Sequence, residues 1–264
     1  MKLIVLAAGF ATRLYPLTLD CPKALLPLGP RHGHRERLLI EHVLDATGEI
    51  AQAGHVYVVS NALFIEQFET WAREYRKDCP GRVIELVNDG VRDENQRLGA
   101  VGDLQFVIDL HHIDEDVAVV AGDNLFSRPL RGFREFCQSK QGPVVGVYDV
   151  GDVGQVRKYS VVHTDPDGRI LFFEEKPSQP DSTLAAIALY YYPRAVLPLI
   201  REYLAKKNNP DHSGRLIQWL YPRVPCYAWP VPGQWLDVGS PETLEAARDI
   251  CVAGNSLSSG PANS

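Results

Sequence analysis

The sequence has no apolar run long enough to span a bilayer and no recognisable targeting segment. Its first apolar run, residues 3–8, is too short for the core of a signal peptide, and Gly9 and Arg13 interrupt it. We therefore expect a cytoplasmic protein that binds no membrane. Its 264 residues, of which 45% are hydrophobic and 23% charged, are enough to bury a sizeable core.

The sequence also has few cysteines and fewer basic than acidic residues. The five cysteines are odd in number and scattered, with no C-x-x-C pair and no Cys/His spacing typical of a zinc site. A formal net charge of −6 argues against a nucleic-acid partner. Residues 1–40 are the exception, because their six basic side chains stand against only Asp20 and Glu36. A local basic surface on an acidic protein favours a small, highly charged ligand.

The order of apolar and amphipathic segments predicts an α/β protein. Strands alternate with helices in the first half, which indicates βαβ units and a parallel sheet, and after about residue 143 closely spaced strands indicate an antiparallel extension. The expected strands are 3–8, 55–60, 83–87, 116–121, 143–149, 159–163, 170–175, 186–192 and 225–229. The expected helices are 37–53, 62–77, 99–111, 129–139, 194–206, 212–221 and 240–252. We expect one domain over 1–252, with halves of about 1–142 and 143–252, and a flexible tail at 253–264.

The segment Gly9-Phe10-Ala11-Thr12-Arg13 follows the first strand and lacks the glycine spacing of both the Walker loop and the dinucleotide fingerprint. Open α/β sheets bind ligands at the carboxyl ends of their strands. Free backbone N–H groups in this turn, together with Arg13, are suited to a polyphosphate. Taken alone, the segment is equally typical of an ordinary turn with a surface arginine.

Three more ionisable residues stand at expected strand ends or turns. Lys23 lies between a proline turn and an apolar segment, where it is either a phosphate ligand or a snorkelling surface lysine. Asp123 follows the strand 116–121, and Asp237 stands in a second apolar context. Each acid alone is typical of a helix or turn cap, but two carboxylates brought together need a cation between them. Mg²⁺ sites with few protein ligands and substrate phosphates are built in this way.

The expected strand 170–175 ends in Glu175-Lys176-Pro177. Either this is a solvated strand terminus, or Glu175 accepts hydrogen bonds from hydroxyl groups while Lys176 binds a phosphate.

Taken together and in this order, the segments resemble the sugar-1-phosphate nucleotidyltransferases, and most of all the glucose-1-phosphate thymidylyltransferases. The matching segments are LAAGFATRLYPLT with PKALLPL, then AGDN, FEEKP and WLDVGS, and the resemblance covers roughly residues 2–250. It implies the Rossmann-like nucleotide-diphospho-sugar transferase fold, a mixed, mainly parallel sheet flanked by helices. The first half would bind the nucleotide and the antiparallel extension the sugar.

The resemblance also implies a role for each matching residue. Asp123 and Asp237 would hold Mg²⁺, while Glu175 and Lys176 would bind the hydroxyls and the phosphate of the sugar. The nucleoside triphosphate would contact the first loop, the segment ENQRLGA and one metal ligand: Leu6, Ala8, Gly9, Ala11, Thr12, Arg13, Leu98, Gly99, Ala100 and Asp123.

The implied reaction joins the two anions directly. The phosphate of the sugar 1-phosphate attacks the α-phosphorus of the triphosphate, and pyrophosphate leaves. A phosphate monoester is already an anionic nucleophile, so no general base is needed, in line with the absence of a compelling histidine-centred pair. Catalysis would then be positioning and charge neutralisation by Mg²⁺, Arg13, Lys23 and Lys176. Asp123 and Asp237 complete the catalytic set as the residues that hold the Mg²⁺.

Three departures from the family pattern concern the substrates and the first loop. Ala11 stands where the family has a second glycine, which predicts a slightly reshaped loop because alanine avoids positive φ. A basic loop at 29–37 replaces a short turn. Arg215 follows Gly214 where thymidylyltransferases often have a glutamate. Asp211 and Arg215 are therefore candidates for sugar recognition, with helix capping by Asp211 or Ser213 as the alternative.

We expect dTTP or UTP as the donor and glucose 1-phosphate as the acceptor. The alternatives are cytidylyl or guanylyl transfer to another sugar or polyol phosphate, and a non-catalytic binding protein of the same fold. A homo-oligomer is expected by resemblance.

Overall fold

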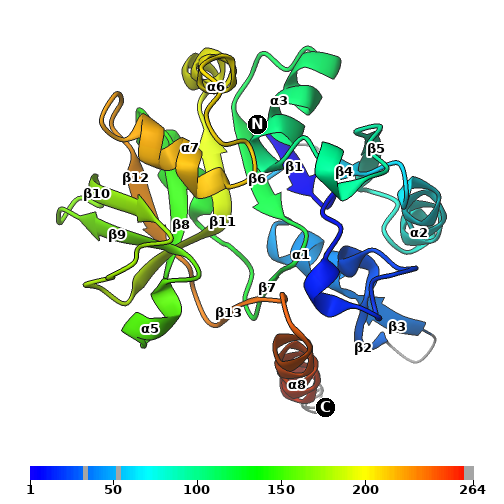
Figure 1. The fold of residues 1–264 in the computed structure, drawn as a ribbon. Coiled ribbons are helices and arrows are strands. Elements are labelled where there is room, and N and C mark those ends of the chain that lie inside the picture. Colours follow the sequence, from blue (N-terminus) through cyan, green and yellow to red (C-terminus); the bar gives the residue numbers. More distant parts are fainter. Residues whose placement is uncertain (32–34, 52–54, 259–264) are drawn as a thin grey trace.

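The computed structural model describes residues 1–31, 35–51 and 55–258, and its centre is a mixed sheet flanked by helices (Figure 1). The strands run in the order β10-β9-β11-β6-β1-β4-β5, with β8 beside β11 and β12 beside β8. The parallel strands of the first half are β1 (Lys2–Leu6), β4 (His55–Ser60), β5 (Val83–Asn88) and β6 (Val117–Ala121). The expected parallel core is confirmed.

Strand β1 is buried on both faces because helices cover each side of the sheet. Leu3 and Val5 point into one apolar core with α1 (Leu39–Ala46), α2 (Ile65–Asp78) and α4 (Phe133–Ser139). Ile4 points to the other face, where it packs with α3 (Ala100–Leu110), α6 (Leu197–Ala205) and α7 (Ser213–Leu220). This two-sided burial explains why the strand reads as an unbroken apolar run.

The second half adds the expected antiparallel strands, which Figure 1 shows on the side of the molecule away from β4 and β5. Its longest strand, β11, pairs antiparallel with β6, and Leu189 lies opposite Val120. The strands of this half are β8 (Val144–Asp149), β9 (Ser160–Thr164), β10 (Ile170–Glu175), β11 (Leu184–Tyr192) and β12 (Tyr227–Pro230). The last of them departs from the expected antiparallel pattern, because β12 pairs parallel with β8.

Several boundaries differ from the sequence-based expectation. The basic loop expected at 29–37 instead contributes to a hairpin of β2 (Pro27–Arg31) and β3 (Arg35–Leu38), while residues 32–34 lie outside the described residues. Because of this hairpin the helix expected at 37–53 begins only at Leu39, and α1 (Leu39–Ala46) ends before a turn; residues 52–53 of the expected helix lie outside the described residues.

Two short strands and one short helix were not predicted, because they have too few residues to show a periodic pattern. These are β7 (Asn124–Phe126), β13 (Trp235–Asp237) and α5 (Val153–Val156). At the carboxyl end, α8 (Pro241–Ser258) continues past residue 252, so the first part of the expected tail is helical, while 259–264 lie outside the described residues. Among the described helices none has the length and apolarity needed to cross a membrane.

Candidate active site

The loops after β1 and β6 meet because these strands are parallel neighbours that end level with each other. Leu6 lies opposite Ala121, and the backbone N–H of Gly122 donates to the carbonyl of Leu6 at 2.8 Å. A cavity of about 240 Å³ opens here between the sheet and the start of α3. Its walls include the predicted nucleotide residues Leu6, Ala8, Gly9, Gly99, Ala100 and Asp123.

A smaller adjoining cavity, of about 80 Å³, lies under the first loop and is lined by Gly9, Ala11, Lys23 and Asp123, among others. Ala11 has φ 53° and ψ 38°, the left-handed conformation in which the family has glycine. Ala11 thus adopts the positive φ that alanine ordinarily avoids, at a strain of roughly 1–2 kcal/mol. The hydroxyl of Thr18 donates to the Ala11 carbonyl at 2.8 Å and holds this conformation.

Lys23 and Asp123 form a close ion pair at the floor of the site. The amide of Asn124 donates to the other oxygen of Asp123 at 2.8 Å, and the indole N–H of Trp235 donates to Asn124 at 2.6 Å. Although burial raises the pKa of Asp123, the Lys23 ammonium and these hydrogen bonds bring it below its ordinary value. Asp123 is therefore a fixed carboxylate with a defined orientation.

Asp237 lies beside Asp123 because β13 pairs antiparallel with β7. In this pairing Asp237 is opposite Asn124, and the N–H of Val238 donates to the Asp123 carbonyl at 3.0 Å. Burial and the negative charge of Asp123 raise the pKa of Asp237 to about 6. Arg13 reaches the same place, since a Cβ on Gly239 would lie 3.3 Å from its Nη2 and 3.5 Å from Asp237 Oδ2.

Two neighbouring carboxylates, one of which raises the pKa of the other, are suited to a divalent cation. Within the described ranges, no group of three or more His, Cys, Asp or Glu side chains is placed to hold a metal. A cation at Asp123 and Asp237 would need further oxygen ligands from outside the protein, as Mg²⁺ takes from substrate phosphates and water.

Glu175 and Lys176 end β10 in two different environments. Glu175 is 8% exposed and accepts a short hydrogen bond from the hydroxyl of Ser160. Its carboxylate packs against Gly214 at the start of α7, where a Cβ would overlap its Oε2. Lys176 is exposed, has φ 49°, and its ammonium lies 2.6 Å from Nε2 of His212.

His212 accepts this hydrogen bond only while it is neutral. Burial and the positive charge of Lys176 lower its pKa below the usual value, which keeps the ring neutral. Contacts through Tyr159 link Lys176 to the strand that carries Asp237. The backbone N–H of Lys176 donates to the Tyr159 carbonyl at 2.7 Å. The Tyr159 ring packs edge-on against Trp235, with 5.1 Å between the ring centroids.

Other predicted residues lie in different places. Asp211 lines the 240 Å³ cavity but is held by Arg97 through two parallel hydrogen bonds of 2.9 and 3.0 Å. Arg215 is exposed on α7 and Thr12 is exposed in the first loop, and neither lines the two cavities. Leu98 lies outside both cavities and packs near Gly102, where a Cβ would be 3.0 Å from its own Cβ.

Sequence reasoning missed three residues that the structure places at the site. Asn124 follows Asp123 directly and reads as a turn cap. His212 lies next to Asp211 but carries no spacing signal. Asp103 is a buried acid on the mainly apolar buried side of α3, where Gln105 is the other polar residue, and this mismatch of polarity and face is the signal that was available.

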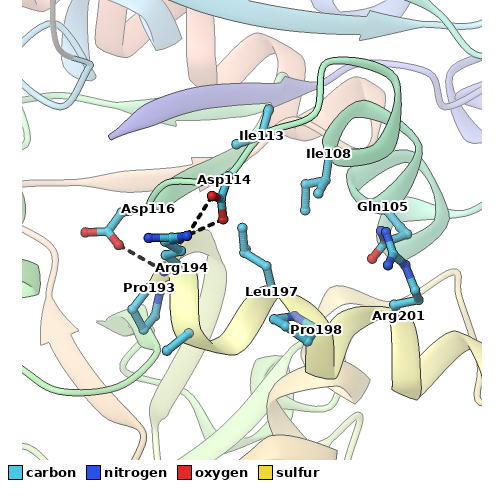
Figure 2. A pocket seen from close by; sticks show the side chains of 11 residues that line it. Gln105, Ile108, Ile113, Asp114, Asp116, Pro193, Arg194, Leu197, Pro198 and Arg201 are labelled. Carbon is cyan, nitrogen blue, oxygen red and sulfur yellow. Dashed lines mark hydrogen bonds and ion pairs between the residues drawn. The ribbon is translucent and has the colours of Figure 1, made fainter.

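A larger cavity of about 740 Å³ lies at the other end of strands β6 and β11, between α3, α6, the residues before β6 and the residues after β11 (Figure 2). None of the predicted functional residues lines it. Arg194 binds Asp114 there through two hydrogen bonds of 2.6 and 2.7 Å, and its backbone N–H donates to Asp116 at 2.9 Å. These contacts tie the two strands together.

A sequence model of the nucleotidyl transferase family matches residues 2–252. The chain belongs to this family. As a nucleotidyl transferase it has the fold that the motifs implied, and the strand-end loops, the ion pair and the acid pair described above lie within the matched range.

Curated relatives of this nucleotidyl transferase have different named substrates. It is 28% identical to a glucose-1-phosphate thymidylyltransferase of Mycolicibacterium smegmatis, over 95% of this chain and 82% of that protein. It is also 28% identical to a mannose-1-phosphate guanyltransferase of Pichia angusta, over 92% of this chain and 62% of that protein. The chain spans less than two thirds of the length of several relatives that it matches.

Among solved structures, UDP-glucose pyrophosphorylase complexed with UDP-glucose superposes with a TM-score of 0.77 at 22% identity, covering 96% of this chain and 98% of that one. At this identity the likeness shows the fold. It confirms the mixed, mainly parallel sheet expected of a nucleotidyl transferase.

Proposed function

We propose that this protein transfers a nucleotidyl group from a nucleoside triphosphate to a sugar 1-phosphate and releases pyrophosphate. The observation that carries the proposal is the cluster of Lys23, Asp123 and Asp237 beside the loop that follows β1, where Asp123 also lines the 240 Å³ cavity. Membership of the nucleotidyl transferase family supports the same reaction class.

Asp123 and Asp237 would hold Mg²⁺, since their carboxylates are adjacent and Asn124 orients one of them. When bound, the cation would neutralise phosphate charge and draw the phosphates into register. The protein's own cations surround the same place. Lys23 lies on Asp123, and Arg13 reaches Asp237, so both are placed to meet phosphate oxygens.

The acceptor would lie on the other side of the acid pair, between β10 and α7. Lys176 would bind the phosphate of the sugar, and the fixed Glu175 carboxylate would accept hydrogen bonds from hydroxyl groups. Two anions that must react with each other need flanking positive charge more than a base, which the set Arg13, Lys23 and Lys176 supplies.

The relatives support more than one substrate pair. Our expectation of dTTP or UTP with glucose 1-phosphate agrees with the thymidylyltransferase of M. smegmatis. Guanylyl transfer to another sugar phosphate agrees with the guanyltransferase of P. angusta. The carboxyl of Asp103 in the cavity favours the second, as argued below.

The test is pyrophosphate release with Mg²⁺ across dTTP, UTP, CTP, GTP and ATP against glucose, mannose, galactose and N-acetylglucosamine 1-phosphates. We expect release that needs both substrates and stops on addition of EDTA. Asp123→Asn serves as the inactive control, and Lys206→Ala, an exposed lysine paired with Glu202, as the active one. Absence of release across the matrix by folded protein would contradict the proposal.

A further inference from the structure

Asp103 places a buried carboxyl in the wall of the 240 Å³ cavity. The residue stands in the first turn of α3 and is 7% exposed. Its Oδ1 is a buried atom with no hydrogen-bond partner. Among the buried side-chain nitrogen and oxygen atoms of the described residues, only one atom each of Gln105 and His111 also lacks a partner. Neither Gln105 nor His111 lines this cavity.

Among the residues that the structure describes, no cationic side chain forms an ion pair with this carboxyl. The neighbouring Asp89 adds negative charge, and its own Oδ1 is occupied by the N–H of Val91 at 2.8 Å. Arg97, the arginine of the cavity wall, is bound to Asp211. Burial, with the charge of Asp89, raises the pKa of Asp103 to about 7. A buried acid in this state lacks hydrogen-bond donors, and a ligand in the cavity is placed to supply them.

The cavity fixes which part of a nucleotide meets Asp103. One end is lined by Asp123, next to Lys23, where a triphosphate finds positive charge. Asp103 lies on α3, whose first residues also line the cavity. Val119 and Ala188 belong to an apolar part of the wall, which elsewhere carries the polar side chains of Asp89, Arg97, Asp211 and Ser213. A base stacked against that apolar wall would direct its polar edge to the carboxyl.

The bases differ in what they offer a carboxylate. Guanine presents its N1–H and its 2-amino group side by side, so that two parallel N–H donors match the two oxygens of a carboxylate. Uracil and thymine present one N–H between two carbonyl oxygens, which a carboxylate repels. Adenine and cytosine present one amino group beside an unprotonated ring nitrogen, and can therefore satisfy only one oxygen.

We propose that Asp103 binds the N1–H and 2-amino groups of guanine and thereby makes GTP the preferred nucleotide. This inference rests on the proposed function only in taking the cavity as the nucleotide site. It names the base that the site selects.

The experiment compares wild type with Asp103→Asn, which keeps the shape of the side chain, and with Asp109→Asn, which removes an exposed acid of the same helix. Binding of GTP, ITP, ATP, CTP, UTP and dTTP is measured by calorimetry without any sugar phosphate. ITP differs from GTP only in lacking the 2-amino group. We expect wild type and Asp109→Asn to bind GTP roughly tenfold or more tightly than ITP, UTP or dTTP.

In Asp103→Asn we expect GTP binding to weaken by about tenfold or more and the preference for GTP over ITP to disappear. Tighter binding of UTP or dTTP than of GTP by wild type overturns the proposal, as does an equal loss of all nucleotides in Asp103→Asn. Because binding is read without turnover, the two proposals separate. Selective GTP binding without pyrophosphate release would sustain this inference and contradict nucleotidyl transfer, whereas release with dTTP or UTP as the best donor would do the reverse.

Discussion

Lys23 is paired with Asp123, while Asp237 lies beside the same carboxylate and has no such close ion pair of its own in the described structure. The two acids therefore have opposite effects on the fold although both are placed to hold a cation. Asp123 compensates a largely buried ammonium, whereas Asp237 brings a second negative charge to a buried position.

This asymmetry predicts different stabilities for two equally inactive variants. Asp123→Asn leaves Lys23 without its partner and should lower the free energy of unfolding by about 1–3 kcal/mol. Asp237→Asn removes the repulsion and should raise it by about 1–3 kcal/mol at pH 8 without metal. Both should lose Mg²⁺-dependent pyrophosphate release. Chemical denaturation in EDTA measures the change in the free energy of unfolding. Near-normal turnover in either variant would contradict the metal site.

The acid pair also shows what the sequence made predictable. The motifs AGDN and WLDVGS identified Asp123 and Asp237, and unbroken apolar runs identified the parallel strands. The short β7 and β13 strands that bring the acids together have no detectable period, since each has three residues. Lys176 meeting His212 likewise depends on how β10 packs against α7, which the local sequence does not encode.

Asp103 predicts a dependence of stability on pH. Its carboxyl has a pKa of about 7 in the folded protein and an ordinary value of 3.8. The folded state therefore keeps a proton that the unfolded state releases, so this residue's contribution falls as pH rises from about 4 to about 7. The loss is on the order of 3–4 kcal/mol. The free energy of unfolding is measured by denaturation at pH 5 and pH 8. Its decrease between the two pH values should be smaller in Asp103→Asn than in wild type, while Asp109→Asn should behave as wild type.

Ala11 predicts a stabilising substitution inside the nucleotide loop. With φ 53°, alanine is strained where glycine is not, so Ala11→Gly should raise the free energy of unfolding by about 0.5–1 kcal/mol after the entropy of glycine is subtracted. Ala195→Gly, at an exposed residue with negative φ, should lower it by about 0.5–1 kcal/mol. Thermal denaturation compares the two. A loss of stability in Ala11→Gly equal to that in Ala195→Gly would show that the loop is not strained.

The absence of a side chain at Gly214 leaves room for the Glu175 carboxylate, so we expect sugar binding to depend on this glycine. A methyl group there would overlap Oε2 of Glu175 and lie 2.7 Å from the hydroxyl of Ser160, so Gly214→Ala must displace the buried carboxylate. We expect about 1–3 kcal/mol of destabilisation and a raised KM for the sugar 1-phosphate. Gly81→Ala meets no atom within 4 Å and should change neither. An unchanged KM in a folded Gly214→Ala variant would remove Glu175 from the sugar site.

Lys176 and His212 predict a split between the two substrates. Lys176→Ala should raise the KM for the sugar 1-phosphate by about tenfold or more and leave triphosphate binding nearly unchanged, because the ammonium lies on the side of β10 and α7. His212→Ala should cause a smaller rise in the same KM, since the imidazole only orients the ammonium, and Lys206→Ala serves as the unaffected control. Initial rates with each substrate varied in turn separate the effects. Equal losses toward both substrates in Lys176→Ala would place this lysine at the shared phosphates instead, because only a group between the two anions contacts both.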